Sequence, residues 1–387
     1  MERMDDAMTD DWYAVIPAGG TGSRLWPISR RNKPKFLYDI LGQGRTLLQS
    51  TYDRLARRMD PDHICVVTGW RHVDEVRRQL PQLPACNILA EPVQRDSTAA
   101  IALAAAVMAK RHGNHIVIGS FAADHVIRGM DAFDEAVEQA VVAARAGYLA
   151  TIGIAASRPS TAFGYIHEGN SLADELPAAS RARKVLRFVE KPDAVTAQSY
   201  LSTGEYRWNA GMFMMRVDML FDFLRSHKPQ IATAIEEIAD VIVQADDGSQ
   251  DAAARIDEVM ARHWHGIEKI ALDYAVAEPL SLNGGVAVVP GDFGWDDVGD
   301  FNSVAALLPS ANERNVKIVG NEDDVVLLDS AGDVVVPASG RTVALLGVND
   351  MVVADTPDAL LVAPRARSQE VKDMVKVLAQ QGRGEVL

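Results

Sequence analysis

An apolar run from Tyr13 to Ala18 leads directly into a loop with glycines at positions 19, 20 and 22. Glycine accepts positive φ and lets backbone N–H groups approach an anion closely. Arg24 and Lys35 add fixed positive charge near this loop in the sequence. A strand, a glycine loop and two cations predict a phosphate site. On the glycines alone, an ordinary strand-to-helix turn is the alternative.

Two common glycine motifs fit this loop poorly. A Walker loop needs Gly-Lys-Ser/Thr after its second glycine, and the loop lacks it. A dinucleotide fingerprint has the form G-x-G-x-x-G/A, whereas Leu25 stands at its third site here. The leucine therefore disfavours a dinucleotide-dependent oxidoreductase.

Composition limits the class of protein. The chain has 387 residues, of which 48% are apolar and 24% charged, as expected for one large globular domain and a smaller one. A net charge of −14 argues against nucleic-acid binding. The longest alanine-rich apolar run, residues 99–109, is too short to span a bilayer. We expect a cytoplasmic protein with no nucleic-acid or membrane partner.

The acidic residues 1–11 contain no apolar signal core, and we expect them to be disordered. The two cysteines, Cys65 and Cys86, lack metal-ligand spacing and indicate a reducing compartment. Both are expected to be small buried hydrophobic residues rather than reactive thiols.

Apolar strand patterns alternate with helix patterns along the first half of the chain. The strands are expected near residues 13–18, 63–68, 87–90 and 115–120, and the helices near 46–58, 73–80, 99–111 and 133–144. This alternation predicts a parallel sheet with both faces covered. Ligands in such sheets bind at the carboxyl ends of the strands, so the glycine loop, Glu91 and Asp124 should converge there.

The pattern changes in the second half. Further strands are expected near residues 149–154, 161–167, 185–192, 208–215 and 286–290, and a helix over 301–308. From about Asn315, short apolar strands separated by turns precede a terminal helix over 368–379. We therefore predict a large α/β domain over 12–312 and a β-rich domain over 313–387 with a terminal helix, for which a small sandwich is one possibility.

Three acidic residues suggest specific chemistry. Asp124 and Asp297 lie in loops, and Mg²⁺ in nucleoside triphosphate sites is held by one or two carboxylates plus phosphates. Asp296 competes with Asp297 for this role, and solvated or helix-capping aspartates are the alternative. Glu91 could accept the adjacent N1–H and N2–H₂ donors of guanine, which adenine does not offer. A simple Glu-Pro turn is the alternative for Glu91.

The stretch Gly19-Gly-Thr-Gly-Ser-Arg-Leu-Trp-Pro-Ile-Ser-Arg30, followed by Lys33-Pro-Lys-Phe-Leu37, resembles the signature of sugar-nucleotide pyrophosphorylases. Its Leu-Trp-Pro form is similar to the mannose-1-phosphate guanylyltransferase branch. Val189-Glu-Lys-Pro192, Trp208-Asn-Ala-Gly211 and Glu268–Glu278 match further motifs of that family in the expected order. Two departures are visible: Lys35 directly precedes Phe36 without an intervening glutamine, and Arg95-Asp-Ser-Thr-Ala99 replaces the commoner Arg-Asn-Thr-Ala-Pro.

The resemblance implies an α/β fold with a Rossmann-like mixed, mainly parallel sheet flanked by helices. It also implies a small C-terminal left-handed β-helix-like domain, which is often used for dimer contacts, and hence a homodimer. The implied reaction is Mg²⁺-dependent: GTP and mannose 1-phosphate give GDP-mannose and diphosphate. Nucleotidyltransferases for glucose or heptose 1-phosphate, and a non-catalytic sugar-nucleotide sensor, are the alternatives. The sensor is disfavoured because Arg24, Lys35 and the aspartates are all present.

The resemblance also assigns roles to individual residues. The nucleotide-binding residues are Ala18, Gly19, Gly20, Thr21, Gly22, Ser23, Arg24, Lys35, Glu91, Arg95 and Ser97. The sugar-phosphate residues are Asp124, Gly164, Tyr165, Glu190, Lys191, Asn209 and Asp273, of which Asp273 could instead orient a helix. Asp124 and Asp297 are the implied metal ligands, and Arg24, Lys35 and Lys191 the implied catalytic residues.

Overall fold

The computed structural model describes residues 11–247, 249 and 251–387. The chain forms two compact units, each built from separate stretches of sequence. The first unit contains the stretches ending at Gly19 and spanning Thr51–Ala123 and Ile127–Trp295; the second contains Gly20–Ser50, Asp124–Val126 and Asp296–Leu387. Of the acidic terminus expected to be disordered, residues 1–10 lie outside the described part, and the Asp11 carbonyl accepts a hydrogen bond from Val117 N at 2.9 Å.

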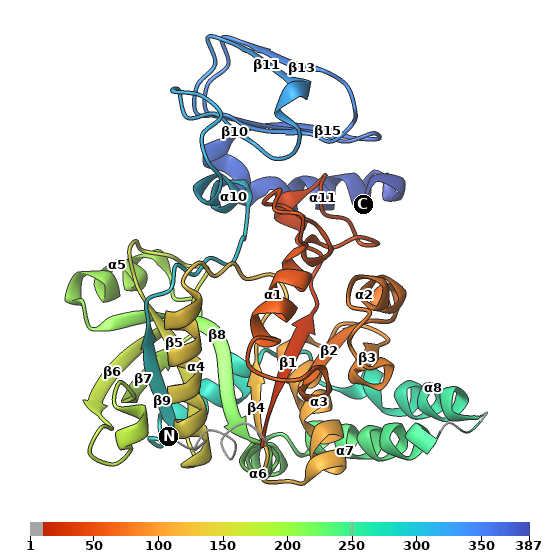
Figure 1. Ribbon diagram of the computed structural model, residues 1–387, viewed down its shortest axis with the longest axis vertical. Coiled ribbons are helices and arrows are strands. Elements are labelled where there is room, and N and C mark those ends of the chain that lie inside the picture. The colour runs from red at the N-terminus through yellow and green to blue at the C-terminus, as the bar shows by residue number, and fades with distance from the viewer. Residues whose placement is uncertain (1–10, 248, 250) are drawn as a thin grey trace, which may run out of the picture. The chain divides into compact units, whose positions relative to one another are not determined.

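The first unit is organised around a nine-stranded sheet with the order β3-β2-β1-β4-β8-β5-β9-β7-β6 (Figure 1). Its strands are β1 (Trp12–Ala18), β2 (Ile64–Gly69), β3 (Ile88–Glu91), β4 (Val117–Ser120), β5 (Leu149–Ala155), β6 (Tyr165–Ser171), β7 (Arg183–Val189), β8 (Tyr206–Arg216) and β9 (Val286–Gly291). Strands β3, β2, β1 and β4 pair in parallel, as do β5 and β9. Only β8 and β7 run against the other seven, because each pairs antiparallel with its neighbours. The mixed, mainly parallel sheet is therefore confirmed.

Helices cover both faces of this sheet. The helices between β1 and β9 are α1 (Leu47–Leu55), α2 (Val73–Gln79), α3 (Asp96–His112), α4 (Met130–Arg145), α5 (Ala194–Thr203), α6 (Val217–His227), α7 (Pro229–Gln244), α8 (Ala252–His263) and α9 (Glu278–Ser281). Tyr13 and Val15 of β1 join the core formed with α3, α6 and α7. Trp12, on the other face of β1, meets Phe121, and Phe121 meets Phe133 of α4. Alternate side chains of one strand thus enter two cores, as in a sheet covered on both sides.

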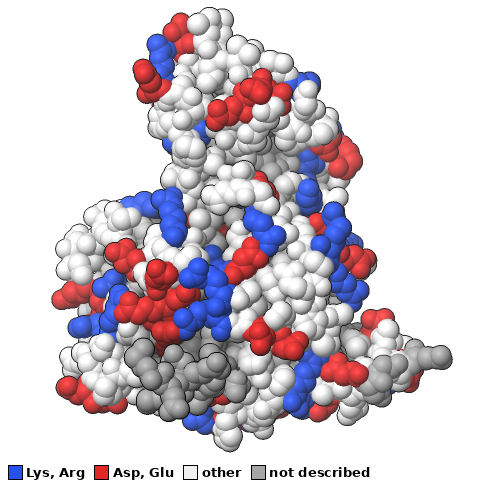
Figure 2. Space-filling view, in the orientation of Figure 1, with Lys and Arg blue, Asp and Glu red and all other residues white. Residues whose placement is uncertain are grey.

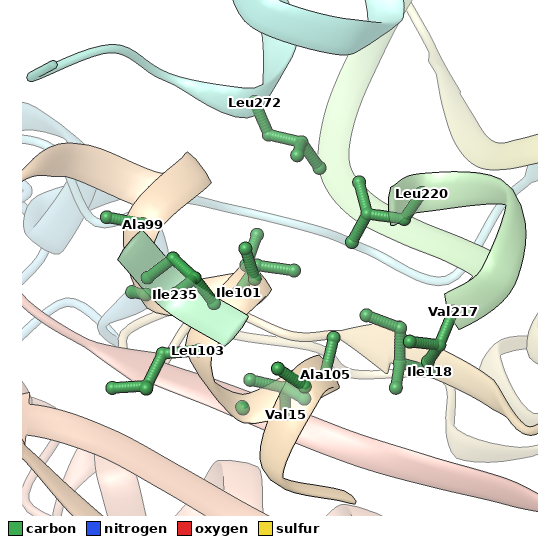
Figure 3. Close-up of a cluster of buried hydrophobic side chains, with 14 of the residues drawn as sticks. Val15, Ala99, Ile101, Leu103, Ala105, Ile118, Val217, Leu220, Ile235 and Leu272 are labelled. Atoms are coloured by element: carbon green, nitrogen blue, oxygen red, sulfur yellow. The ribbon is translucent and has the colours of Figure 1, made fainter. Parts of the chain in front are cut away.

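The all-apolar helix predicted from the alanine-rich run is buried. Every residue of α3 from Thr98 to Ala109 is buried. Figure 3 shows its Ile101 and Ala105 in one cluster with Ile118, Leu220 and Ile235, from β4, α6 and α7. The helix begins at Asp96, three residues before the predicted start. No helix in the described part of the chain is long and apolar enough to cross a membrane.

In the second unit, the C-terminal strands wind into a coil. Strands β10 (Lys317–Ile318), β12 (Val334–Pro337) and β14 (Met351–Asp355) form one parallel sheet, which β15 (Leu360–Pro364) joins antiparallel. Strands β11 (Val325–Leu328) and β13 (Val343–Leu346) form a second parallel pair. Because successive strands alternate between parallel sheets, the β-helix-like prediction is confirmed over a sandwich of antiparallel strands.

Two helices and the signature segment complete this unit. Helix α10 (Phe301–Leu307) precedes the coil and α11 (Val371–Gln380) follows it. Leu25, Trp26 and Ile28 of the signature segment share one core with residues of α10, β12, β14 and α11. The early signature segment therefore folds together with the C-terminal part of the chain, which the order of the motifs did not indicate.

The prediction for the two cysteines was half right. Cys65 is buried in β2, and burial raises the pKa of its thiol to about 12. Cys86 is exposed, so its expected burial was wrong. It lies in a short turn before β3 rather than on an inward-facing strand position.

Acidic and basic side chains are interspersed on the face of the molecule shown in Figure 2.

Candidate active site

The glycine loop follows β1 and makes two left-handed turns. Gly20 has φ +82° and Gly22 φ +64°, so both adopt the conformation for which glycine was expected. A Cβ at Gly22 would stand 3.0 Å from the Cβ and Cγ atoms of Lys35, so a side chain there would crowd the lysine. Gly20 and Thr21 are exposed, and Ser23 begins a short 3₁₀ turn. The loop thus offers accessible backbone beside a fixed cation.

Lys35 joins three separate segments of the second unit. Its ammonium lies 2.8 Å from Asp124 Oδ2 and donates to the carbonyl oxygens of Asp297 at 2.8 Å and Val298 at 3.3 Å. The guanidinium of Arg24 donates to the Gly299 carbonyl at 3.2 Å. Both signature cations therefore reach the turn at residues 297–299.

A backbone bridge brings Asp124 and Asp297 together. Val126 N donates to the Asp296 carbonyl at 2.9 Å, and Asp296 N donates to the Val126 carbonyl at 3.0 Å. Burial raises the pKa of Asp297; Lys35 and His125 lower it, while Asp296 and Asp124 raise it, and the result lies above the usual range. Burial also raises the pKa of Asp124, but Lys35 and His125 outweigh it and bring the result below the usual range.

These carboxylates fit a cation that substrate phosphates help to hold. Among residues 11–247, 249 and 251–387, no group of three or more His, Cys, Asp and Glu side chains could hold a metal ion. Mg²⁺ is commonly bound by one or two carboxylates and completes its shell with phosphates and waters. Burial is the largest cause of the raised pKa of Asp297, and Lys35 and His125 offset it only in part, so a bound cation would favour the ionised carboxylate.

The competing Asp296 has a structural partner. Its Oδ1 accepts a hydrogen bond from Val298 N at 2.7 Å. Val298 has φ +49°, which is strained for a β-branched residue, and this hydrogen bond helps to hold it there. The Asp296 side chain thus shapes the turn, which favours Asp297 as the metal ligand.

Glu91 ends β3 in the first unit and lies close to the start of the glycine loop. A Cβ at Gly19 would stand 3.9 Å from Glu91 Oε1, so the ends of β1 and β3 converge here as predicted. Glu91 is 4% exposed, and its Oε2 is buried without a hydrogen-bond partner in the described part of the chain. Burial raises the pKa of Glu91 to about 7, against a lowering hydrogen bond from the Arg95 backbone. The site therefore leaves a carboxyl oxygen for a donor from a ligand.

The neighbouring Arg95 and Ser97 make contacts within the protein. The Arg95 guanidinium donates to the His265 carbonyl. Ser97 Oγ accepts a hydrogen bond from Leu272 N at 2.9 Å, and Thr98 N donates to the Ile270 carbonyl at 3.3 Å. The bonds of Ser97 and Thr98 attach the segment before Asp273 to the start of α3. Arg95 and Ser97, both predicted to bind the base, therefore hold neighbouring parts of the protein backbone in place.

Glu190 and Lys191 form a pair at the end of β7. Lys191 Nζ lies 2.6 Å from Glu190 Oε1, while Glu190 Oε2 is buried without a hydrogen-bond partner among the described residues. A Cβ at Gly164 would collide with Glu190 Oε2, so glycine is needed for this close approach. Burial raises the pKa of Glu190, and Lys191 lowers it only in part. The lysine side chain is half-exposed and remains open to an anion.

Asn209 and Asp273 are linked directly. Asn209 Nδ2 donates to Asp273 Oδ1 at 2.9 Å, and Asn209 Oδ1 accepts from Thr151 Oγ1 at 2.8 Å. Burial, with Glu190 as the second cause, raises the pKa of Asp273 to about 7. Asp273 begins a π-helical turn, Asp273–Ala277, a distortion that often marks functional sites. Asn209 thus orients Asp273.

Two further side chains, Tyr165 and Glu278, support the Glu190 region from within the protein. The Tyr165 ring is fully buried with Ala197 and Trp208, so it supports the neighbouring Gly164 from the core. Glu278, absent from the predicted site, accepts a hydrogen bond from Glu190 N at 2.8 Å. The 268–278 motif contained Glu278, but only the fold shows that it holds the Glu190 backbone.

Comparisons with known proteins agree with these features. Residues 13–313 match the nucleotidyl transferase family, and residues 323–378 match the MannoseP isomerase/GMP-like beta-helix domain. The mannose-1-phosphate guanylyltransferase of Klebsiella pneumoniae is 37% identical over 374 residues, which is 96% of this chain and 74% of that protein. The xanthan biosynthesis protein XanB of Xanthomonas campestris is 37% identical over 97% of this chain and 75% of its own.

Solved structures show the same likeness. A Thermus thermophilus protein described as a mannose-1-phosphate geranyltransferase superposes with a TM-score of 0.79 at 32% identity, over 95% of this chain and 99% of that one. A Helicobacter pylori mannose-6-phosphate isomerase shares the fold, with a TM-score of 0.56 at 20% identity, over 74% of this chain and all of that one.

The chain belongs to the nucleotidyl transferase family. Within that family, its likeness is to the mannose-1-phosphate guanylyltransferases, at 37% identity over nearly the whole chain. The family, fold class and enzyme class expected from the motifs are thereby confirmed.

Proposed function

We propose that the protein transfers GMP from GTP to mannose 1-phosphate and releases diphosphate. An oxygen of the sugar phosphate forms a bond to the α-phosphorus of GTP. The bond from that phosphorus to the bridging oxygen breaks, and diphosphate leaves with the electron pair. No enzyme nucleophile is needed, so catalysis consists of positioning and charge neutralisation.

The observation that carries this proposal is the position of Lys35. Its ammonium contacts Asp124 and the backbone of Asp297, the two proposed metal ligands. Lys35 would neutralise negative charge on the α-phosphate in the transition state. Arg24, with the backbone N–H groups of Gly20, Thr21, Gly22 and Ser23, would hold the departing diphosphate.

Asp124 and Asp297 would hold the magnesium ion. Bound there, Mg²⁺ would neutralise triphosphate charge and orient the α-phosphate. The supporting observations are the bridge between Val126 and Asp296 and the raised pKa of Asp297.

Glu91 is the proposed guanine reader, with Ala18 and Gly19 supplying backbone beside it. Its buried, unpartnered Oε2 would accept one of the adjacent donors of guanine and Oε1 the other. Adenine lacks this donor pair, so the same carboxylate would discriminate against ATP. Arg95 and Ser97 would support this region through their contacts with His265 and Leu272.

The sugar phosphate would bind around Glu190 and Lys191. The half-exposed Lys191 ammonium suits the phosphate, and the unpartnered Glu190 Oε2 can accept a hydrogen bond from a sugar hydroxyl. Asp273, oriented by Asn209, offers a second acceptor. Gly164 would leave room for the Glu190 carboxylate, and the buried Tyr165 ring would support Gly164 from the core.

A substrate panel tests the proposal. Diphosphate release would be measured with four nucleoside triphosphates and with mannose, glucose and heptose 1-phosphates. Selective release with GTP and mannose 1-phosphate is the expected result. A preference for another pair would replace the substrates but keep the enzyme class, whereas binding without release for every pair would indicate a sensor.

We also propose that the protein works in the cytoplasm as a homodimer formed through its C-terminal coil. Apolar side chains are exposed there: Leu328 and Leu346, which are paired neighbours on β11 and β13, have 61% and 71% of their surface accessible. Burying such a patch against a second copy would remove apolar surface from water. Light scattering should give twice the monomer mass, and Leu346→Glu should shift the protein toward monomer.

A further inference from the structure

The signature segment is attached to the last residues of the chain. The Trp26 indole Nε1 donates to the Val386 carbonyl at 2.7 Å, and Arg30 Nη1 donates to the same oxygen at 2.6 Å. Trp26 is 6% exposed and Val386 4%. One carbonyl oxygen, withdrawn from water, thus receives two donors from the segment that carries Arg24.

Arg30 makes further contacts that fix its orientation. Its guanidinium makes a two-bond contact with Asp358, with N–O distances of 2.6 and 3.1 Å, and donates to Thr356 Oγ1 at 3.2 Å. Its Nε donates to the Pro27 carbonyl at 2.7 Å. A planar guanidinium that uses both edges in this way is held far more rigidly than a lysine would be.

The segment between these contacts is closed on itself. Ser29 Oγ donates to the Gly22 carbonyl at 2.5 Å, and Leu25 N donates to that same carbonyl at 2.8 Å. Leu25 is fully buried in the core shared with Val371 of α11. Arg24 stands within this closed segment, so its backbone position depends on the contacts of Trp26 and Arg30.

The C-terminal part of the chain also holds the turn that Arg24 reaches. Asp300, next to the Gly299 carbonyl that accepts from Arg24, receives a hydrogen bond from the Gln369 side chain. Asn302 Nδ2 donates to the Arg365 carbonyl and to Ser368 Oγ, each at 2.9 Å. Both ends of the Arg24–Gly299 hydrogen bond are therefore supported from residues 356–386.

We propose that Trp26 and Arg30, joined at the Val386 carbonyl, are positioning residues for the diphosphate-binding Arg24. In this proposal Trp26 and Arg30 do not contact substrate. They fix the backbone that carries Arg24 and so determine the position of its guanidinium. The inference rests on the proposed role of Arg24 toward diphosphate and adds what holds Arg24 in place. It assigns residues 356–386 of the second unit a part in nucleotide chemistry, besides any part of the coil in assembly.

Two conservative variants of the full chain test this assignment. Trp26→Phe keeps the buried ring but removes the Nε1–H donor, and Arg30→Lys keeps the charge but removes the two-edged geometry. Calorimetry would measure binding of inorganic diphosphate with Mg²⁺, which does not depend on turnover. We expect each variant to weaken this binding about five- to tenfold, the effect of one or two lost hydrogen bonds. Binding of mannose 1-phosphate should change less than twofold.

Arg314→Lys is the matched control. Arg314 pairs with the exposed Asp329 in the same coil, at 3.2 Å, and does not contact the signature segment. This variant should bind diphosphate as the wild type does. A double-mutant cycle adds the specific readout: in an Arg24→Ala background, Trp26→Phe should cause no further loss, because its effect passes through Arg24.

Three results would overturn the inference. The first is unchanged diphosphate binding in both variants. The second is equal weakening toward diphosphate and mannose 1-phosphate, which would show general destabilisation. The third is a full additional loss from Trp26→Phe when Arg24 is already absent. If Arg24→Ala itself leaves diphosphate binding unchanged, the proposed role of Arg24 fails. The cycle separates that outcome from failure of the positioning role proposed for Trp26 and Arg30.

Discussion

The Lys35 ammonium lies 2.8 Å from the Asp124 carboxylate. The cation proposed to neutralise the α-phosphate is therefore already paired with a proposed metal ligand before substrate arrives. Such pairing keeps a charged side chain in a fixed position, which reduces the reorganisation needed during the reaction.

Replacing Lys35 should therefore impair the chemical step. We expect Lys35→Ala to lower kcat at least about 100-fold, by analogy with removal of one oxyanion donor. Diphosphate release at saturating substrates is the measurement. Lys33→Ala is the control, because it removes a nearby lysine whose ammonium lies over the Tyr38 ring, 4.1 Å from the ring centroid. Wild-type turnover in Lys35→Ala would refute the proposed role.

The two neighbouring aspartates should differ in their effect on metal dependence. Asp297→Asn removes the charge of a proposed ligand, so the Mg²⁺ concentration for half-maximal activity should rise about tenfold or more. In Asp296→Asn the amide oxygen can still accept from Val298 N, so the turn should persist and the requirement should change little. Equal effects of the two variants on the Mg²⁺ titration would contradict the assignment of Asp297.

GTP binding should weaken on the acid side of neutrality because of Glu91. Its pKa is about 7 in the free protein, and two guanine donors would favour the ionised form and lower that pKa. GTP binding would then release a proton below pH 7, so affinity should fall by up to about tenfold per pH unit, down to the lowered pKa.

Glu91→Gln isolates this effect, because the γ-phosphate of GTP titrates equally in both experiments. The variant should bind GTP about ten- to 100-fold more weakly at pH 8, as expected for loss of a charged hydrogen-bonding pair. Its GTP affinity should also lack the part of the pH dependence that Glu91 adds to that of the γ-phosphate. If calorimetry shows the same slope in both proteins, Glu91 is not the titrating guanine ligand.

A methyl group at position 164 should affect the sugar-phosphate substrate. The Cβ of Gly164→Ala would overlap Glu190 Oε2 and displace the Glu190–Lys191 pair. We expect KM for mannose 1-phosphate to rise about tenfold with little change in KM for GTP. Gly266→Ala is a suitable control, because an added Cβ there would meet no atom within 4 Å and Gly266 does not have a positive φ. An equal rise in both KM values would argue against a local effect.

Much of the fold could be predicted because the relevant signals are local. The alternation of apolar runs and helix periods located the strands from β1 to β4 and the buried helix α3. Short strands after residue 315 were predicted from their apolar runs and turns, but the spacing alone left a sandwich open. Parallel pairing between β12 and β14 decides in favour of a coil, and such pairing depends on contacts far apart in sequence.

The candidate site was predictable at the level of segments but less so at the level of atoms. Motifs identified Lys35, Asp124 and Glu190. In the structure Lys35 and Asp124 form an ion pair, and Glu190 has a buried carboxyl oxygen without a hydrogen-bond partner among the described residues. The motifs could not show that Ser97 holds the segment before Asp273 or that Asn209 orients that aspartate. They also gave no sign that Trp26 meets Val386, 360 positions later in the chain. Each of these contacts is created only by the tertiary fold.

The stereochemical course at the α-phosphorus tests the central claim most directly. A single displacement by the sugar phosphate inverts the configuration there, whereas two successive displacements through an enzyme-bound nucleotide retain it. GTP carrying one sulfur on the α-phosphorus, in a single configuration, would be converted with mannose 1-phosphate, and the configuration of the product determined. The account predicts a GDP-mannose analogue with inverted configuration; retention of configuration, or the absence of any sugar-nucleotide product, would contradict it.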